Sequence, residues 1–426
     1  MSQQIKVSAR NENGIMGYRI TATAPTATTV TRPVHLALVM DKSGSMEGDR
    51  ISSVKKTLNV LIDALELGDK ITLVGFSGMA SVIINAAVIG DAEARAALKV
   101  SVDTLTADGG TNMEAGVVAL GALFTGVKAP DSVVVLTDGY VNEGITSIAG
   151  IYSLLNSYLP SVPVYALGYG TDHNAEFMRA LSSRTNGTYT FLDSEIALPA
   201  AIGDLLGGLK GEVAKAAHIS FPAHWKCLEL NAGDGVIGMG SLVADKPTWV
   251  IFELAATATA AASPLLAPSL SYRMVDSGTT YMVSLDSVPA DSVTNVELQE
   301  QYLRCIVAKA LDDASVLLRN YKINDAKILI SATVDKISAS VAAGGAMAIR
   351  MKAQLDEMKE ELERGGNHQH ILLQSSGTAA RYTQQRGVSS GGVVDEMFST
   401  PTLRRHQTQM VQQYSQAPAD PTNDMT

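Results

Sequence analysis

The sequence predicts an α/β fold in which a doubly wound, mostly parallel sheet is inserted in, or flanked by, a small antiparallel β-sandwich and is followed by a helical region. Three observations support this prediction. Short apolar runs rich in β-branched residues alternate with amphipathic helical segments between residues 34 and 213. Short strands of alternating polarity follow between residues 218 and 285, and helical periodicity begins at residue 295. A chain that alternates strands and helices typically forms a parallel sheet covered by helices on both faces.

The α/β segment begins with a continuous apolar run over residues 35–40, as expected for a strand that is buried on both faces. Apolar residues at helical spacing follow, and Gly68 ends that helix. In sheets of this kind, ligands bind at the carboxyl ends of the strands. The expected strands are 35–40, 70–76, 81–89, 132–137, 163–167 and 188–192, and the expected helices are 51–65, 92–105, 113–124, 148–158, 174–183 and 196–213.

The next segment predicts a small antiparallel β domain, because its short runs alternate in polarity and are separated by turn residues. Residues 5–8 and 18–23 also favour strands, although they precede the α/β segment. We therefore expect these N-terminal strands to complete the β domain, which makes the α/β domain an insertion. The expected strands of this segment are 218–221, 226–230, 249–254, 269–274 and 280–285.

The C-terminal part is expected to be helical over 295–319, 321–343 and 346–364, with Gly365 and Gly366 ending the last helix. The residues that follow are rich in Gln, Ser, Gly and Thr, which predicts a flexible tail. Residues 398–411 are less polar and could dock on a partner or on the core. The predicted organisation is N-terminal strands of the sandwich over 1–30, the α/β domain over 31–213, the β-sandwich domain over 214–290, the helical region over 291–365 and the tail over 366–426.

Composition restricts the class of protein. The net charge is −10 with both signs mixed along the chain, which argues against nucleic-acid binding through a general electrostatic field. The only cysteines, Cys227 and Cys305, exclude a disulfide framework and a Cys-rich zinc module; two buried thiols are favoured over one bridge. The N-terminus does not resemble a secretory signal. Residues 249–270 are the most apolar stretch, but Glu253 and two prolines dilute it, so we expect a protein without a membrane span, located in the cytoplasm.

A cluster of oxygen ligands follows the first strand of the α/β segment. Asp41-Lys42-Ser43-Gly44-Ser45 places a carboxylate and two hydroxyls at alternate positions, where they can converge on one small cation. Oxygen ligands in octahedral array suit Mg²⁺ or Mn²⁺. Because hydroxyls are neutral, such a site leaves the ion electrophilic.

Two further loops supply oxygens at strand-to-helix connections. Thr111 precedes the helix expected at 113–124, and Asp138 follows the strand 132–137. Each residue also has a purely structural interpretation. Thr111 and Glu114 have the spacing of a capping box, and Asp138-Gly139 could form an ordinary turn. The order of the three motifs, each in a strand-to-helix loop, favours a metal site formed by Asp41, Ser43, Ser45, Thr111 and Asp138.

The segment from Val34 to Val213 resembles the von Willebrand factor A domain family, whose metal-ion-dependent adhesion site has the form Asp-x-Ser-x-Ser, then Thr, then Asp. Stretches outside the motif are also similar, among them Gly75-Phe76-Ser77 and Leu167-Gly168-Tyr169-Gly170. The resemblance implies that Ser43, Ser45 and Thr111 coordinate the ion directly, while Asp41 and Asp138 act directly or through water. It also implies that a carboxylate of a partner protein completes the coordination, so that the domain is a binding module.

The flanking regions resemble those of intracellular A-domain proteins of eukaryotic microbes and plants, some of which carry a RING or U-box module. This chain lacks RING cysteine spacing, so no ligase activity is implied. We expect a scaffold or adaptor that is not an enzyme. The alternative is an assembly or ubiquitin-pathway component whose helical region, 295–364, oligomerises. We expect a monomer or a weak homodimer, no nucleic-acid ligand and no membrane partner.

Enzymatic interpretations fit the motif less well. Haloacid-dehalogenase-like phosphatases need a second carboxylate two residues after the first, and Ser43 occupies that position. Ser43 and Ser45 have no adjacent His or Lys pattern that would activate a nucleophile. Gly168-Tyr169-Gly170 lacks the third glycine of a dinucleotide loop. His368-Gln369-His370 is a weak zinc candidate within the expected tail.

Overall fold

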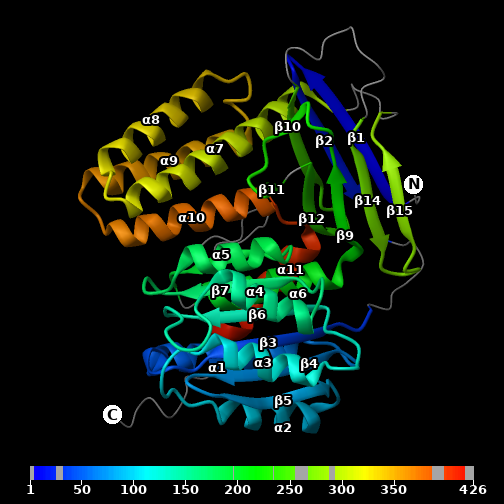
Figure 1. Cartoon of the computed structure of the whole chain (residues 1–426), viewed down its shortest axis with the longest axis vertical. Coiled ribbons are helices and arrows are strands. Elements are labelled where there is room, and N and C mark those ends of the chain that lie inside the picture. Colours follow the sequence, from blue (N-terminus) through cyan, green and yellow to red (C-terminus); the bar gives the residue numbers. More distant parts are fainter. Residues whose placement is uncertain are drawn as a thin grey trace. The chain divides into compact units, whose positions relative to one another are not determined.

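The computed structural model describes residues 4–24, 32–194, 196–233, 235–254, 267–286, 293–385 and 398–417. The chain divides into two compact units (Figure 1). One unit comprises residues 28–210 and 387–426, and the other comprises residues 1–27 and 211–386. Residues 28–210 are therefore inserted in the sequence of the second unit, as the sequence predicts, and residues 387–426 belong to this inserted unit as well. The boundaries expected at residues 30 and 290 lie outside the described residues.

The inserted unit contains a six-stranded sheet of order β5-β4-β3-β6-β7-β8. Its strands pair in parallel except for β5, which runs antiparallel to β4 at the edge. This is the doubly wound, mostly parallel sheet that the sequence predicts. The strands are β3 (His35–Asp41), β4 (Lys70–Phe76), β5 (Ala80–Val88), β6 (Ser132–Thr137), β7 (Val164–Tyr169) and β8 (Tyr189–Leu192), and the helices are η1 (Gly44–Met46), α1 (Asp49–Ala64), α2 (Ala92–Asp103), α3 (Met113–Leu123), α4 (Ile148–Tyr158), α5 (Ala175–Arg184), α6 (Ala197–Lys210) and α11 (Pro401–Gln416).

Helices cover both faces of this sheet (Figure 1). Side chains of a strand alternate between faces. Leu36, Leu38 and Met40 of β3 therefore share a core with α1 and α6. Val39 points to the opposite face, where Gly116 of α3 lies against it. This burial on both sides explains why β3 has no polar residue between His35 at its start and Asp41 at its carboxyl end.

The prediction of a flexible tail after residue 366 is wrong for its described residues. They form two helices, α10 (His368–Gln384) in the second unit and α11 in the inserted unit. Helix α11 packs on α6, where the backbone of Gln407 comes so close to Gly203 that a Cβ there would lie 2.7 Å from the Gln407 Cα. The Gln407 amide donates a hydrogen bond to Asp204 at 2.9 Å, and both residues are buried. Met410 and Tyr414 join the core of the sheet. The polar composition of this segment reflects the exposed face of α11, because the helix buries only one face.

The second unit contains two antiparallel sheets that share one core. The N-terminal strands β1 and β2 pair with each other, and β2 pairs with β13, so they complete this domain as predicted. Strand β12 is absent from the predicted strands, because Gly238 and Gly240 interrupt its apolar pattern at β-bulges. One sheet has the order β1-β2-β13-β10 and the other β11-β12-β9-β14-β15. The strands are β1 (Ile5–Glu12), β2 (Ile15–Ala22), β9 (Glu212–Ser220), β10 (Trp225–Cys227), β11 (Ala232–Gly233), β12 (Val236–Val243), β13 (Thr248–Leu254), β14 (Ser269–Met274) and β15 (Thr280–Ser284).

The same unit continues into four helices, α7 (Asn295–Arg319), α8 (Ile323–Ala339), α9 (Ala346–Glu363) and α10 (His368–Gln384). Helix α10 occupies the first part of the expected tail. Its end is held to β13, because the Gln385 side chain accepts from the Trp249 N–H at 2.9 Å and donates to the Trp249 carbonyl at 2.7 Å. Arg304 of α7 is fully buried and pairs with Glu229 at 2.5 Å. His368 and His370 are in the first turn of α10, so they lie on a helix rather than in a solvated tail.

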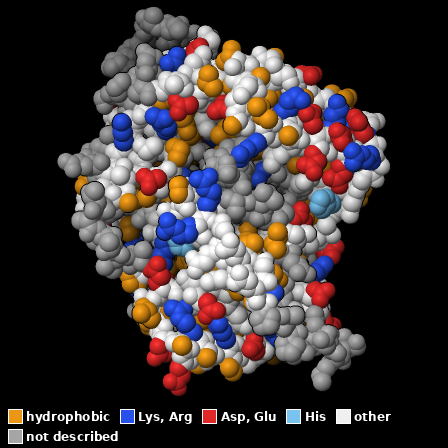
Figure 2. Space-filling view, turned by 180° about the vertical axis from the view of Figure 1, so that it is seen from behind, with side chains coloured by type: hydrophobic (Ala, Val, Ile, Leu, Met, Phe, Trp, Pro, Cys, Tyr) orange, Lys and Arg blue, Asp and Glu red, His pale blue; other side chains and the backbone are white. Residues whose placement is uncertain are grey.

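Residues 249–270 do not form one apolar helix. They begin in β13 and end in β14, and residues 255–266 lie outside the described part. In the part of the chain that the structure describes, no helix is both long enough and apolar enough to cross a bilayer. Cys227 and Cys305 are free thiols. On the face drawn in Figure 2, the described basic side chains lie among acidic ones and form no continuous basic field of the kind that attracts a polyanion.

Candidate metal centre

The five predicted ligands lie in three loops at one edge of the sheet of the inserted unit. Asp41 ends β3, Ser43 and Ser45 lie at the start of η1, Thr111 precedes α3, and Asp138 follows β6. The backbone joins these loops, since the Gly44 N–H donates to the Gly109 carbonyl at 3.0 Å. The neighbouring strands β3 and β6 are parallel and end at the same edge, which explains why Asp41 and Asp138 meet here. Thr111 does not follow a strand, contrary to the prediction, because its loop connects the helices α2 and α3.

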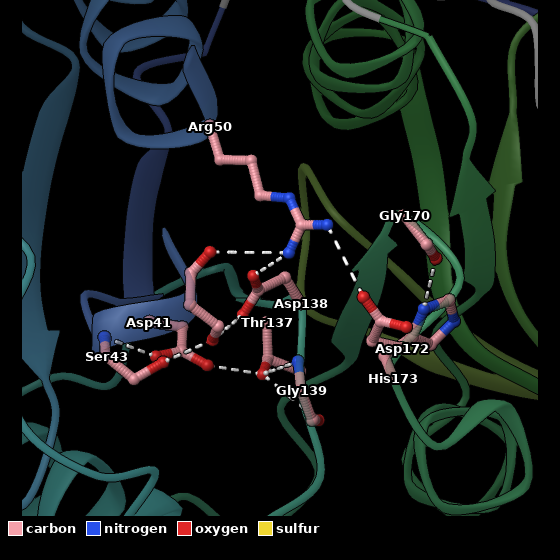
Figure 3. Close-up of polar contacts among 10 residues, drawn as sticks. Asp41, Ser43, Arg50, Thr137, Asp138, Gly139, Gly170, Asp172 and His173 are labelled. Carbon is pink, nitrogen blue, oxygen red and sulfur yellow. Dashed lines mark hydrogen bonds and ion pairs between the residues drawn. The ribbon is translucent and has the colours of Figure 1, made fainter. Parts of the chain in front are cut away.

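Asp41 is completely buried and held by hydrogen bonds. One carboxylate oxygen accepts from the Ser43 N–H at 2.8 Å, and the other accepts from the Thr137 hydroxyl (Figure 3). Burial raises the pKa of Asp41, and the bonds from Thr137 and Ser43 partly oppose that rise. The carboxylate is therefore oriented by the protein before any ligand arrives.

Ser43, Ser45 and Asp138 form a chain of oxygen atoms. The Ser43 and Ser45 hydroxyl oxygens are 3.1 Å apart, and the Ser45 hydroxyl donates to Asp138 Oδ1 at 2.7 Å. Ser43 and Asp138 are buried, whereas Ser45 is exposed. The cluster is consequently open to solvent on the side of Ser45.

Thr111 completes the group. A Cβ placed on Gly139 would lie 3.8 Å from the hydroxyl oxygens of both Ser45 and Thr111, so these oxygens flank the same residue. The alternative capping role of Thr111 does not occur, because Asn112 is the N-cap of α3 and accepts from the Ala115 N–H at 3.1 Å. Glu114, the expected partner in a capping box, accepts instead from the Ile145 N–H at 2.7 Å.

The donor set fits a hard divalent cation. Ligands at adjacent positions of an octahedron with metal–oxygen distances of about 2.1 Å are roughly 3 Å apart. The separations of 3.1 Å between Ser43 and Ser45 and of 2.7 Å between Ser45 and Asp138 are close to that value. Among the described residues, no group of three or more His, Cys, Asp and Glu side chains could hold a metal. An ion at this edge would therefore depend on hydroxyl oxygens.

Arg50 is a component of the site that the sequence analysis did not identify. Its guanidinium forms an ion pair with Asp138 Oδ2 and donates to the Ser45 carbonyl at 3.3 Å (Figure 3). It also lies 3.5 Å from Asp172, in the loop that follows β7. The available signal was its place at the start of α1, where a basic residue is unfavourable beside the positive end of the helix dipole.

A second ionic contact connects neighbouring loops. Lys42 Nζ lies 2.6 Å from Asp108 and 3.2 Å from the Ser77 hydroxyl, which itself donates to Asp108 at 2.7 Å. The bond from Lys42 is the main reason that the pKa of Asp108 is lowered. The Lys42 side chain is only 12% exposed. Lys42 thus connects the loop of Ser43 and Ser45 to the loop before Thr111.

Sequence comparison finds proteins that are similar to the inserted unit. The von Willebrand factor type A domain family matches residues 34–191. An uncharacterized protein of Synechocystis sp. is 28% identical over 172 residues, which are 38% of this chain and 38% of that protein. The inter-alpha-trypsin inhibitor heavy chain H1 of Mesocricetus auratus is 28% identical over 163 residues, which are 36% of this chain and 18% of that protein. The match thus covers well under half the length of either relative.

Two solved structures share the fold over most of the chain. The von Willebrand factor type A protein from Catenulispora acidiphila has a TM-score of 0.62 at 16% identity and covers 85% of this chain and 91% of that chain. The ArnB paralog VWA2 from Sulfolobus acidocaldarius has a TM-score of 0.56 at 14% identity and covers 90% of this chain and 98% of that chain. At these identities the likeness shows the fold alone. Residues 34–191 of this chain therefore form a von Willebrand factor type A domain, which is in general a protein-binding module.

Proposed function

We propose that this chain binds Mg²⁺ or Mn²⁺ through Asp41, Ser43, Ser45, Thr111 and Asp138, and that the ion captures a carboxylate of a partner protein. The observation that supports the proposal most directly is the spacing of the oxygen cluster, which is near that of ligands around one small ion and is open beside Ser45. The chain would act as a scaffold or adaptor.

The low negative charge of the ligand set favours a carboxylate as the ligand that the partner protein supplies to the ion. The five ligands include two carboxylates and three neutral hydroxyls. Coordination through neutral hydroxyls leaves the ion electrophilic, and an acidic side chain is a strong oxygen ligand for a hard cation. The domain would then bind its partner only when the metal is present.

Two loops next to the cluster carry exposed apolar side chains that a partner could cover. Tyr140 directly follows the Asp138-Gly139 turn and is 55% exposed, and Met79 in the β4–β5 turn is 81% exposed. Aromatic residues and Met are enriched at protein interfaces. Tyr140 and Met79 would add affinity and selectivity to the single coordinate bond.

We also propose that the site is not catalytic. Ser43 and Ser45 contact each other and Asp138, rather than a histidine or lysine that could serve as a base. Metal-dependent turnover of simple phosphate esters that disappears in Ser43→Ala would contradict this proposal.

The decisive test is metal binding by the purified chain, followed by capture of partners. Calorimetric titration with MnCl₂ should show binding to the wild type and none to Asp41→Ala. Asp103→Ala is the matched control, because it removes an exposed carboxylate that is on α2 rather than in the cluster. Equal affinity in the wild type and Asp41→Ala would refute the site. Affinity capture in Mg²⁺ or chelator should then yield partners that elute when the metal is removed.

A further inference from the structure

The two carboxylates of the cluster are stabilised in different ways. Asp41 is held by neutral donors, the Ser43 N–H and the Thr137 hydroxyl. Asp138 receives the Ser45 hydroxyl on Oδ1 and the Arg50 guanidinium on Oδ2. Asp138 is completely buried, and a buried carboxylate without a compensating charge is strongly unfavourable. Arg50 therefore supplies the positive charge that Asp138 requires in the metal-free protein.

The position of Arg50 is set by the surrounding backbone. The residue lies in the first turn of α1, and its guanidinium also donates to the Ser45 carbonyl. Gly170 has a φ of +68°, and a Cβ at that position would lie 3.2 Å from Arg50 Nη2. His173, in the same loop, contacts the Gly170 carbonyl at 2.8 Å (Figure 3). Its ring also contacts the Tyr189 hydroxyl at 2.7 Å. The loop after β7 thus leaves room for the Arg50 guanidinium, and His173 of that loop contacts Gly170 and Tyr189 instead of Arg50.

Asp172 offers the same guanidinium a second anion. The Arg50 Nη2 atom lies 3.5 Å from Asp172, whose side chain is 71% exposed, and Asp172 is not among the predicted metal ligands. Arg50 consequently lies between Asp138, which is a proposed ligand of the metal, and Asp172, which is not.

We propose that Arg50 is a built-in counter-cation that competes with the divalent ion for Asp138, and that Asp172 lowers its competitive strength by sharing the guanidinium. This inference rests on the proposed metal site. A cation that approaches Asp138 meets a carboxylate that Arg50 already neutralises, so the affinity of the empty domain for metal is lowered. A partner's carboxylate would restore favourable charge, which couples binding of the metal to binding of the partner.

The test compares the Mn²⁺ affinities of charge variants, read by calorimetry and by the electron paramagnetic resonance signal of free Mn²⁺. Arg50→Gln should bind Mn²⁺ about threefold more tightly than the wild type, a change typical of losing one partly exposed charge pair. Lys99→Gln is the matched control, since it removes the same charge from a pair with Asp63 near the far end of α1. Arg50→Gln affinity equal to or weaker than that of the wild type would overturn the proposal.

Asp172→Asn provides the opposite change and a check on mechanism. It should weaken Mn²⁺ binding, because Arg50 is left with Asp138 as its ionic partner. In an Arg50→Gln background the same substitution should have a smaller effect, since the competing cation is gone. An equal loss in both backgrounds would show that Asp172 acts without Arg50 and would overturn its proposed role.

Thermal unfolding gives an independent reading. In chelator, Arg50→Gln should melt below the wild type, because Asp138 is buried without a cation. Saturating Mn²⁺ should narrow or reverse that difference, since tighter binding stabilises the variant more. A difference that is the same with and without metal would contradict the proposal. Failure of the proposed metal site can be distinguished from failure of the proposed role of Arg50. If the metal site is wrong, Asp41→Ala and the wild type will have the same affinity for Mn²⁺.

Discussion

The Ser53 hydroxyl lies 3.0 Å from the Tyr414 hydroxyl, although 361 residues separate them along the chain. Ser53 is on α1, and Tyr414 is on α11 near the end of the described residues. Lys56 Nζ lies over the same tyrosine ring, 4.5 Å from its centroid. Helix α11 is therefore an integral part of the inserted unit, although the von Willebrand factor type A match ends at residue 191.

Shortening a buried side chain of α11 should destabilise the inserted unit. Met410 is fully buried in the core of the sheet, so Met410→Ala should lower the free energy of unfolding by about 2–5 kcal/mol. Gln409→Ala, an exposed neighbour on the same helix, is the control and should have little effect. Urea unfolding of the two variants and the wild type checks this prediction, and equal midpoints would show that α11 contributes little.

Removing one partner of the buried ion pair Arg304–Glu229 should destabilise the second unit. Arg304→Met leaves Glu229, which is 5% exposed, without a counter-charge, at a cost of about 3–5 kcal/mol. The double variant Arg304→Met, Glu229→Leu should recover much of that loss, because neither charge then remains buried. Urea unfolding measures all three proteins, and a double variant less stable than Arg304→Met would argue against charge burial as the cause.

Stability of the inserted unit should fall in mild acid because of His173. Burial lowers the pKa of His173 from 6.5 to about 4, so the neutral form is preferred in the folded protein. The unfolded chain then binds the proton first as the pH falls from 6.5 to 4, and the contribution of His173 is complete only above pH 6.5. The expected loss is about 1.4 kcal/mol per pH unit in that window.

His173→Gln isolates this contribution. The difference in unfolding free energy between the wild type and His173→Gln should shrink as the pH is lowered from 7.5 to 5, whereas His406→Gln on α11 serves as a partly exposed control. His35 makes the wild type fall further, because burial also lowers its pKa to about 4. A pH-independent difference between wild type and His173→Gln would contradict the prediction.

The Thr111 hydroxyl, if it binds the ion, should be replaceable by serine but not by alanine. Thr111→Ala should weaken Mn²⁺ binding by about tenfold or more, whereas Thr111→Ser should stay near the wild type because it keeps the oxygen. Asn112 rather than Thr111 caps α3, so helix stability should change little in either variant. Calorimetry with circular dichroism separates the two effects, and equal Mn²⁺ affinity in Ala and Ser variants would exclude Thr111 as a ligand.

Local patterns in the sequence were sufficient for the α/β sheet and for the loops that carry the candidate site. The apolar run before Asp41 predicted a strand buried on both faces, and β3 has that environment. The pattern could not predict β12, whose glycines remove the alternation, or α10, which buries small and polar residues such as Ser375 and Ser376. Burial of such residues depends on what packs against them, which composition does not specify.

The amino-acid sequence by itself determined the order of strands and helices in the α/β domain, and it identified Asp41, Ser43, Ser45, Thr111 and Asp138 as the polar residues of one candidate site. These properties follow from residue type and spacing within short windows. Only the tertiary structure decided that Arg50 neutralises Asp138 and that Tyr414 returns to Ser53. The first contact joins residues that are 88 positions apart in the sequence, and the second joins residues that are 361 positions apart. Such contacts arise when packing brings distant segments together, and no local period in the sequence encodes them.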